Sequence, residues 1–200
     1  NRAHLEEVGL QAIREGKVAA VLLAGGQGTR LGFDKPKGMY NIGVTKELYI
    51  FECLINNVMD VVKKAGAWIP FYIMTSDKNY DDTTSFLKEK NYFGYNAEYI
   101  HFFKQEMAPS VDYNGKLLME APDRLSLSPN GNGGWFSSLC RYGYDKQMKE
   151  AGVEWLTAFA VDNVLQRIND PAFVGAVIDS GCDCGGMVVR KADRSGMYLM

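Results

Sequence analysis

Histidine and cysteine, the side chains most often used for metal binding and nucleophilic catalysis, are scarce in this sequence. Only 2 histidines and 4 cysteines occur among the 200 residues. The cysteines show no Cys-x-x-Cys spacing and lack the density of a disulfide-rich secreted domain. We therefore expect reduced thiols, and for Cys182 and Cys184 burial rather than a metal site. His4 and His101 have no partner by spacing, so we expect structural or surface roles for both.

No hydrophobic run in the sequence is long enough to cross a membrane. The longest, from Val18 to Ala24, is far shorter than the roughly 20 residues of a membrane-spanning helix, and no signal-peptide pattern precedes it. Charge of one sign is also lacking, because 22 Lys and Arg face 24 Asp and Glu, a net charge of −2. This balance argues against nucleic acid or an anionic membrane as a partner. We expect a soluble, cytoplasmic protein.

The residues that are abundant are those of an ordinary globular protein, with 46% hydrophobic and 23% charged residues. Buried strands and amphipathic helices alternate, a pattern typical of a Rossmann-like α/β fold: a mixed, mainly parallel sheet with helices on both faces. We expect one nucleotide-binding catalytic domain over residues 1–200, as a fragment of a longer chain. The apolar patterns predict strands over 18–23, 69–75, 97–103, 155–161 and 186–191, and helices over 48–62, 134–151 and 171–180.

The most informative segment is a glycine-rich loop that directly follows the first predicted strand. It reads Leu23-Ala24-Gly25-Gly26-Gln27-Gly28-Thr29-Arg30-Leu31-Gly32 and is followed by Pro36-Lys37-Gly38-Met39. The loop therefore lies at the carboxyl edge of the sheet, where open α/β folds bind ligands. Glycines let backbone N–H groups approach a phosphate closely, Arg30 can bind a phosphate with two hydrogen bonds, and Lys37 can add a point charge. We predict a polyphosphate site.

Two common glycine loops do not fit these residues. A P-loop requires Gly-Lys followed by Ser or Thr, which does not occur here, and a dinucleotide fingerprint requires glycine where Leu31 stands. A tight strand-to-helix turn is the remaining alternative. Such a turn explains one or two glycines, whereas this loop combines four glycines with two cations.

Gly-Gly-x-Gly-Thr-Arg-Leu-Gly followed by Pro-Lys is the motif of the sugar-nucleotide pyrophosphorylases, and this chain most resembles the UDP-N-acetylhexosamine pyrophosphorylases. The resemblance extends from about Glu6 to Lys191 and is strengthened by Tyr72–Ser76, Ser128–Gly134 and Val161–Val164 with Asp170-Pro171. It implies the nucleotide-diphospho-sugar transferase type of fold. It also implies uridylyl transfer from UTP to N-acetylglucosamine or N-acetylgalactosamine 1-phosphate, with release of pyrophosphate.

The resemblance implies roles for the residues of the loop. The nucleotide would be held by Ala24, Gly25, Gly26, Gly28 and Thr29. Catalysis would depend on Lys37 near the phosphates of the reacting centre and on Arg30 near the leaving pyrophosphate. Because a sugar phosphate is already a nucleophile, the reaction needs alignment and charge neutralisation rather than a Ser, Cys or His base.

Three further positions receive roles from the resemblance, each with a simpler alternative. Gln105 would face the edge of uracil, or would be an exposed polar residue. Gly131 and Asn132 would contact the sugar, and Asn132 stands where glucose-type relatives tend to carry histidine; the alternative is a plain turn that leads into a helix. Asp162 would help to place Mg²⁺, because a carboxylate at the end of a buried strand is costly unless it meets a metal or a ligand. It could instead only turn the chain into Asn163.

Alternative functions stay open at this point. The chain could be a glucose-type or broad-specificity UDP-sugar pyrophosphorylase, or a non-catalytic nucleotide-binding module. A nicotinamide-dependent dehydrogenase is disfavoured by Leu31.

Overall fold

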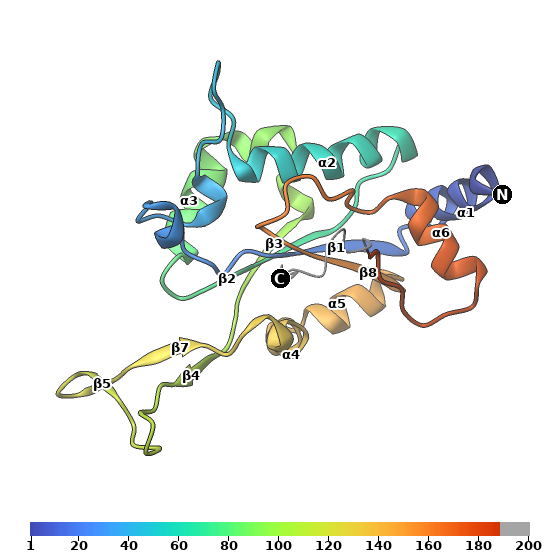
Figure 1. Cartoon of the computed structure of the whole chain (residues 1–200). Coiled ribbons are helices and arrows are strands. Elements are labelled where there is room, and N and C mark those ends of the chain that lie inside the picture. The colour runs from blue at the N-terminus through green and yellow to red at the C-terminus, as the bar shows by residue number, and fades with distance from the viewer. Residues whose placement is uncertain (189–200) are drawn as a thin grey trace, which may run out of the picture.

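The computed structural model describes residues 1–188 and contains a four-stranded parallel sheet between two layers of helices (Figure 1). The strands are β1 (Val18–Leu23), β2 (Phe71–Thr75), β3 (Ile100–Lys104) and β8 (Trp155–Ala160), in the order β3-β2-β1-β8. From β1 the chain builds β2 and β3 on one side and later adds β8 on the other. The strand order therefore reverses beside β1, and doubly wound sheets bind ligands at the carboxyl ends of the strands at such a reversal. The predicted α/β fold is confirmed.

Both faces of β1 are buried, which explains its uninterrupted apolar run. Successive side chains of a strand point to opposite faces. Val18, Ala20 and Leu22 contribute to one hydrophobic core, whereas Ala19 and Val21 contribute to a second core on the other face. The sheet thus has a complete core on each side.

One helical layer is larger than the other (Figure 1). The first core includes residues of α1 (Arg2–Arg14), α2 (Ile50–Ala65), α3 (Tyr80–Glu89) and α6 (Pro171–Asp179). The second core includes residues of α4 (Trp135–Arg141) and α5 (Tyr144–Glu150). Helix α2 ends where Gly66 adopts a positive φ of 71°, as expected for a glycine stop signal.

Helices α1 and α6 cross at a point of very close backbone approach. A Cβ atom placed on Gly175 would lie 1.7 Å from the Leu5 carbonyl oxygen, and one on Gly9 would lie 1.9 Å from the Pro171 carbonyl oxygen. Only residues without a side chain fit at this crossing. The sequence signals neither the crossing nor the pairing of these two helices.

A long antiparallel ribbon between β3 and α4 was not predicted. It consists of β4 (Met107–Pro109) paired with β7 (Leu127–Pro129), and β5 (Met119–Ala121) paired with β6 (Arg124–Leu125). Figure 1 shows it projecting away from the sheet. Its residues are largely exposed, so it lacks the buried apolar face on which sequence patterns depend.

Several predicted boundaries were wrong. The helix expected over 134–151 is two helices, since the chain turns at Gly143 with a φ of +74°. The second strand begins at 71 rather than 69, and the third at 100 rather than 97, because residues 97–99 form a 3₁₀ turn. Cys182 and Cys184 are exposed rather than buried, although all four cysteines are free.

The last predicted strand, over 186–191, falls only partly within the described residues. Residues 186–188 have no regular secondary structure, and the remainder lies outside the described part of the chain. No helix among the described residues is both long and apolar enough to span a bilayer.

Candidate functional site

The carboxyl ends of the four parallel strands bring together segments that are far apart in the sequence. Ala24 follows β1, Ser76 follows β2, Gln105 follows β3 and Asp162 lies just beyond β8. Parallel strands end at one edge of a sheet, so these residues and the glycine loop share that edge. Most of the predicted site residues are therefore gathered by the fold.

The glycine loop closes on itself through its backbone. The Gly28 N–H group donates to the Lys35 carbonyl (3.0 Å), and the Lys37 N–H group donates to the Gly26 carbonyl (3.2 Å). Side chains are excluded at the narrowest point, because a Cβ atom on Gly28 would lie 2.8 Å from the Phe33 carbonyl oxygen. Gly26 and Gly28 thus shape the loop through hydrogen bonds of their backbone atoms. Gly28 also leaves room for the chain to pass close beside it.

The predicted nucleotide-binding residues form two groups: those whose backbone N–H group is already hydrogen-bonded and those whose N–H group has no acceptor. The Ala24 N–H group is bonded to Met74 (2.9 Å), and that of Gly28 is bonded within the loop. In the described part of the chain, no acceptor is found for the N–H groups of Gly25, Gly26 or Thr29. The unpaired donors are the ones that can bind a phosphate directly, whereas Ala24 and Gly28 offer none.

Gln105 is buried, with 6% of its surface exposed, so the alternative of an exposed polar residue is wrong. Its N–H group bonds to the Thr75 carbonyl (2.7 Å), which extends the sheet edge by one residue. Its side-chain amide packs against the first glycine of the loop: a Cβ atom on Gly25 would lie 2.5 Å from Nε2. The close contact leaves no room for a side chain at position 25 unless the Gln105 amide moves.

The loop over 130–134 reaches the same edge through the residue after Gln105. The Asn130 N–H group donates to the Glu106 carbonyl (3.0 Å). Gly131 has a φ of +81°, which favours glycine, and Asn132 begins a short 3₁₀ helix that leads into α4. Both Gly131 and Asn132 are exposed. The segment is a helix-leading turn whose amide side chain is also accessible to a ligand.

The two predicted cations have different environments. Lys37 begins the 3₁₀ helix Lys37–Met39, where Gly38 packs against the Phe51 ring, and only 12% of the Lys37 side chain is exposed. Its Nζ atom forms an ion pair with Asp162 Oδ1. Arg30 is exposed and makes no ion pair within the described residues. The fold thus joins Lys37 to Asp162 and leaves Arg30 open to solvent.

Asp162 supplies a single carboxylate to this edge, and 57% of its side chain is exposed. Within residues 1–188, no group of three or more His, Cys, Asp or Glu side chains could hold a metal ion. This donor set does not suit a structural metal. It fits Mg²⁺ bound together with ligand phosphates, because Mg²⁺ is commonly held by one or two carboxylates, phosphate oxygens and waters.

Two asparagines that sequence reasoning missed hold the site segments in place. Asn79 is fully buried, and its Nδ2 group donates to the Ala24 carbonyl (3.0 Å). Asn57 on α2 donates to the carbonyls of Val164 (3.1 Å) and Gln166 (3.2 Å), which anchors the segment after Asp162. Neither lies in a motif, and only the position of Asn79 shortly after a predicted strand could have drawn attention to it.

The two histidines lie away from this edge, as expected. His101 on β3 stacks on Tyr72, with ring centroids 4.7 Å apart, and burial lowers the pKa of its imidazole. Burial also raises the pKa of Tyr72 to about 12. His4 Nε2 lies 3.0 Å from Asp179 Oδ1 at the surface.

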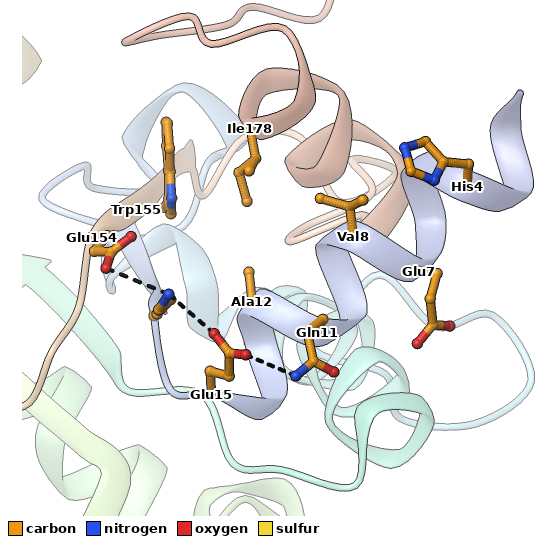
Figure 2. Close-up of a pocket in the computed structure, with 10 residues that line it drawn as sticks. His4, Glu7, Val8, Gln11, Ala12, Glu15, Glu154, Trp155 and Ile178 are labelled. Carbon is orange, nitrogen blue, oxygen red and sulfur yellow. Dashed lines mark hydrogen bonds and ion pairs between the residues drawn. The ribbon is translucent and has the colours of Figure 1, made fainter.

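A cavity of about 450 Å³ lies at the opposite edge of the sheet (Figure 2). Lys17, just before β1, and Trp155, at the start of β8, both line it, so it opens at the amino ends of the strands. Glu15 and Glu154, both labelled in Figure 2, each form an ion pair with Lys17. None of the predicted site residues lines this cavity.

Comparisons with known proteins extend over nearly the whole chain. It is 38% identical to mouse UDP-N-acetylhexosamine pyrophosphorylase-like protein 1, over 96% of this chain and 39% of the relative. It is 41% identical to the UDP-N-acetylglucosamine pyrophosphorylase of Saccharomyces cerevisiae, over 93% of this chain and 40% of the relative. The crystal structure of Trypanosoma brucei UDP-N-acetylglucosamine pyrophosphorylase with an inhibitor has a TM-score of 0.84 and 32% identity, over 90% of this chain and 38% of that one.

The family assignment rests on both sequence and fold. The chain spans 39% to 40% of the length of these two curated relatives. The family model described as UTP--glucose-1-phosphate uridylyltransferase matches residues 4–197. The glycine-loop resemblance is therefore confirmed: this chain belongs to the UTP--glucose-1-phosphate uridylyltransferase family.

Proposed function

We propose that this chain is the nucleotide-binding part of an enzyme that makes a UDP-N-acetylhexosamine and pyrophosphate from UTP and an N-acetylhexosamine 1-phosphate. A phosphate oxygen of the sugar phosphate attacks the α-phosphorus of UTP, and the bond from that phosphorus to the pyrophosphate oxygen breaks. The observation that carries the proposal is the sheet edge itself. Unpaired N–H groups, a largely buried lysine and a buried amide converge there, in a chain whose relatives are named for this activity.

The phosphates of UTP would be held by the glycine loop. The N–H groups of Gly25, Gly26 and Thr29 are free to donate to phosphate oxygens. Lys37 would neutralise charge around the α-phosphorus, and Arg30 would bind the leaving pyrophosphate with two parallel hydrogen bonds. Fixed donors of this kind lower the barrier because they need no rearrangement as charge develops.

Gln105 would read the base. An amide offers one acceptor and two donors, which match a neighbouring N–H and carbonyl on the edge of uracil. Adenine presents a different pattern of donors and acceptors, so the same amide in a fixed orientation discriminates against ATP. Its burial against Gly25 supports a fixed orientation.

Mg²⁺ is the cofactor of this proposal, and it would neutralise phosphate charge when bound. Asp162 is the protein ligand, with phosphate oxygens and water completing the donor set. The ion pair between Asp162 and Lys37 supports this role, because Lys37 is the residue proposed to neutralise phosphate charge.

The sugar would be bound by the exposed loop over 130–134. Gly131 and Asn132 are exposed at the same edge, and the Asn132 amide can both donate to and accept from an acetamido group. Glucose 1-phosphate is the second candidate substrate, because the matching family model is described by that sugar. Turnover of N-acetylglucosamine 1-phosphate and glucose 1-phosphate by a longer protein that includes this chain separates the two. Faster turnover of glucose 1-phosphate would contradict the role given to Asn132.

We also propose that the protein is located in the cytoplasm. The four free cysteines are compatible with a reducing compartment.

Calorimetric titration of the chain with UTP and Mg²⁺, with ATP as the matched control, tests the nucleotide site. We expect saturable binding of UTP and much weaker binding of ATP. Equal affinities would remove the role of Gln105, and no binding of either nucleotide would contradict a phosphate site in this chain. UTP binding without pyrophosphate exchange by the longer protein would instead favour a non-catalytic module.

A further inference from the structure

The turn between β2 and α3 places a buried amide against the first peptide of the glycine loop. The side chain of Asn79 is fully buried and is bonded at both ends. Its Oδ1 atom accepts from the Ser76 N–H group (2.7 Å), and its Nδ2 group donates to the Ala24 carbonyl (3.0 Å). Because both the oxygen and the NH₂ group of this amide are hydrogen-bonded, the side chain has one orientation. The Ala24 carbonyl that it contacts is therefore held in a fixed direction.

Fixing this carbonyl also fixes the next N–H group. The described chain contains no cis peptide bond, and in a trans peptide the C=O and N–H bonds point in opposite directions. With the Ala24 oxygen bound to Asn79, the Gly25 N–H group points away from the Asn79 side chain. No acceptor for it is found within the described residues. The Ala24 N–H group is itself tied to Met74 (2.9 Å), so the peptides on both sides of residue 24 are restrained.

Helix capping does not account for this side chain. Asn79 occupies the position before the first turn of α3, where an asparagine usually accepts a hydrogen bond from that turn. Here no such bond forms, and the amide turns back toward β1 and β2. Helix α3 therefore has no side-chain hydrogen bond at its N-cap, and the Asn79 amide instead holds the start of the glycine loop.

We propose that Asn79 is a positioning residue for nucleotide binding, which holds the Ala24 carbonyl so that the Gly25 N–H group stays aimed at a phosphate of UTP. The inference rests on the proposed function. A donor that is already oriented loses no conformational freedom when the ligand arrives, so affinity depends on the anchor as well as on the donor. Asn79 itself need not touch the nucleotide.

Two substitutions of Asn79 test the role of its hydrogen bonds. Asn79→Asp keeps an oxygen acceptor for Ser76 but replaces the donor to Ala24 with a second oxygen. Asn79→Ala removes both bonds and serves if the buried carboxylate prevents folding. Asn96→Ala is the control, because Asn96 makes a similar local bond to the Glu98 N–H group (3.0 Å) at an exposed site. Thermal unfolding establishes that each variant is folded at the temperature of the titration.

Calorimetry with UTP and Mg²⁺ and the amide NMR resonance of Gly25 are the two measurements. We expect either Asn79 variant to bind UTP about tenfold more weakly, the effect of roughly one hydrogen bond. We also expect the UTP-induced shift of the Gly25 resonance to be lost, a change that reduced stability alone does not produce. Asn96→Ala should match the parent chain in both measurements.

The outcomes distinguish this inference from the function on which it rests. If the parent chain does not bind UTP, the proposed function fails and the inference fails with it. If the parent chain and both Asn79 variants bind UTP equally well, with the same shift at Gly25, the inference alone is wrong.

Discussion

Gly25→Ala is expected to weaken UTP binding by displacing Gln105. The added Cβ atom would lie 2.5 Å from Nε2 and 2.8 Å from Oε1 of that amide, whereas ordinary contacts begin at 3.4 Å. The amide must therefore retreat by about 0.6 to 0.9 Å, a shift large enough to break well-aligned hydrogen bonds. Loss of the two bonds proposed to uracil, at about 0.5 to 1.5 kcal/mol each, corresponds to roughly a 5- to 150-fold rise in Kd.

The fold itself should tolerate this substitution. The clash is with the end of a flexible side chain rather than with backbone, so Gln105 can move. Replacing glycine by alanine also stabilises a compatible site by about 0.4 to 1 kcal/mol, because the unfolded chain loses freedom. Gly186→Ala is a suitable control, since nothing lies within 4 Å of the added atom. We expect both variants to unfold near the temperature of the parent chain.

A double-mutant cycle tests whether Gln105 transmits the effect. Calorimetry with UTP is applied to the parent chain, Gly25→Ala, Gln105→Ala and the double variant. If Gly25→Ala acts through the amide, it should add little once that amide is gone, and the two losses should not sum. Additive losses would show that the new methyl group acts on the ligand directly. An unchanged Kd in Gly25→Ala would refute the reasoning altogether.

Two predictions concern stability. Gly175→Ala should lower the free energy of unfolding by about 1 to 3 kcal/mol despite the better helix propensity of alanine, because its Cβ atom would lie 1.7 Å from the Leu5 carbonyl oxygen. Urea unfolding measures this, and an unchanged midpoint would mean that α1 and α6 can separate freely. Burial lowers the pKa of His101, so below the ordinary value of about 6.5 the unfolded chain binds more protons and the folded state loses stability as the pH falls. His101→Phe should lose less stability than the parent chain between pH 7.5 and 5; equal losses would contradict the assignment.

How much of the fold the sequence predicts depends on burial. Strands β1 and β8 are recognisable because apolar residues fill nearly every position, and β1 has the same bounds as predicted. The ribbon that includes β4 and β7 was not predicted because neither of these strands has a buried face, so no apolar pattern marks them in the sequence. Gly143 lies inside an otherwise helical pattern, where an isolated glycine can be tolerated and does not by itself predict the end of a helix.

In the candidate site, features formed by neighbouring residues could be predicted from the sequence, whereas contacts between distant residues could not. The glycine loop is continuous in sequence, so its phosphate-binding character could be predicted from residues alone. Lys37 and Asp162 are 125 positions apart, and their ion pair depends on β8 lying beside β1 rather than beside β3. Nothing in either local pattern specifies that strand order.

The pairing of Gly25 with Gln105 shows how a fold turns two separately ambiguous residues into one specific feature. By itself, Gly25 could be a turn glycine, and Gln105 could be an exposed polar residue. The register of β1 with β2 and of β2 with β3 brings both to the same edge, where the glycine leaves room for the amide. The hydrogen bond from Asn79 to the Ala24 carbonyl holds the Ala24–Gly25 peptide in place. A substitution at any of the three positions should therefore alter nucleotide affinity, and combining substitutions shows which of these effects pass through a neighbouring residue.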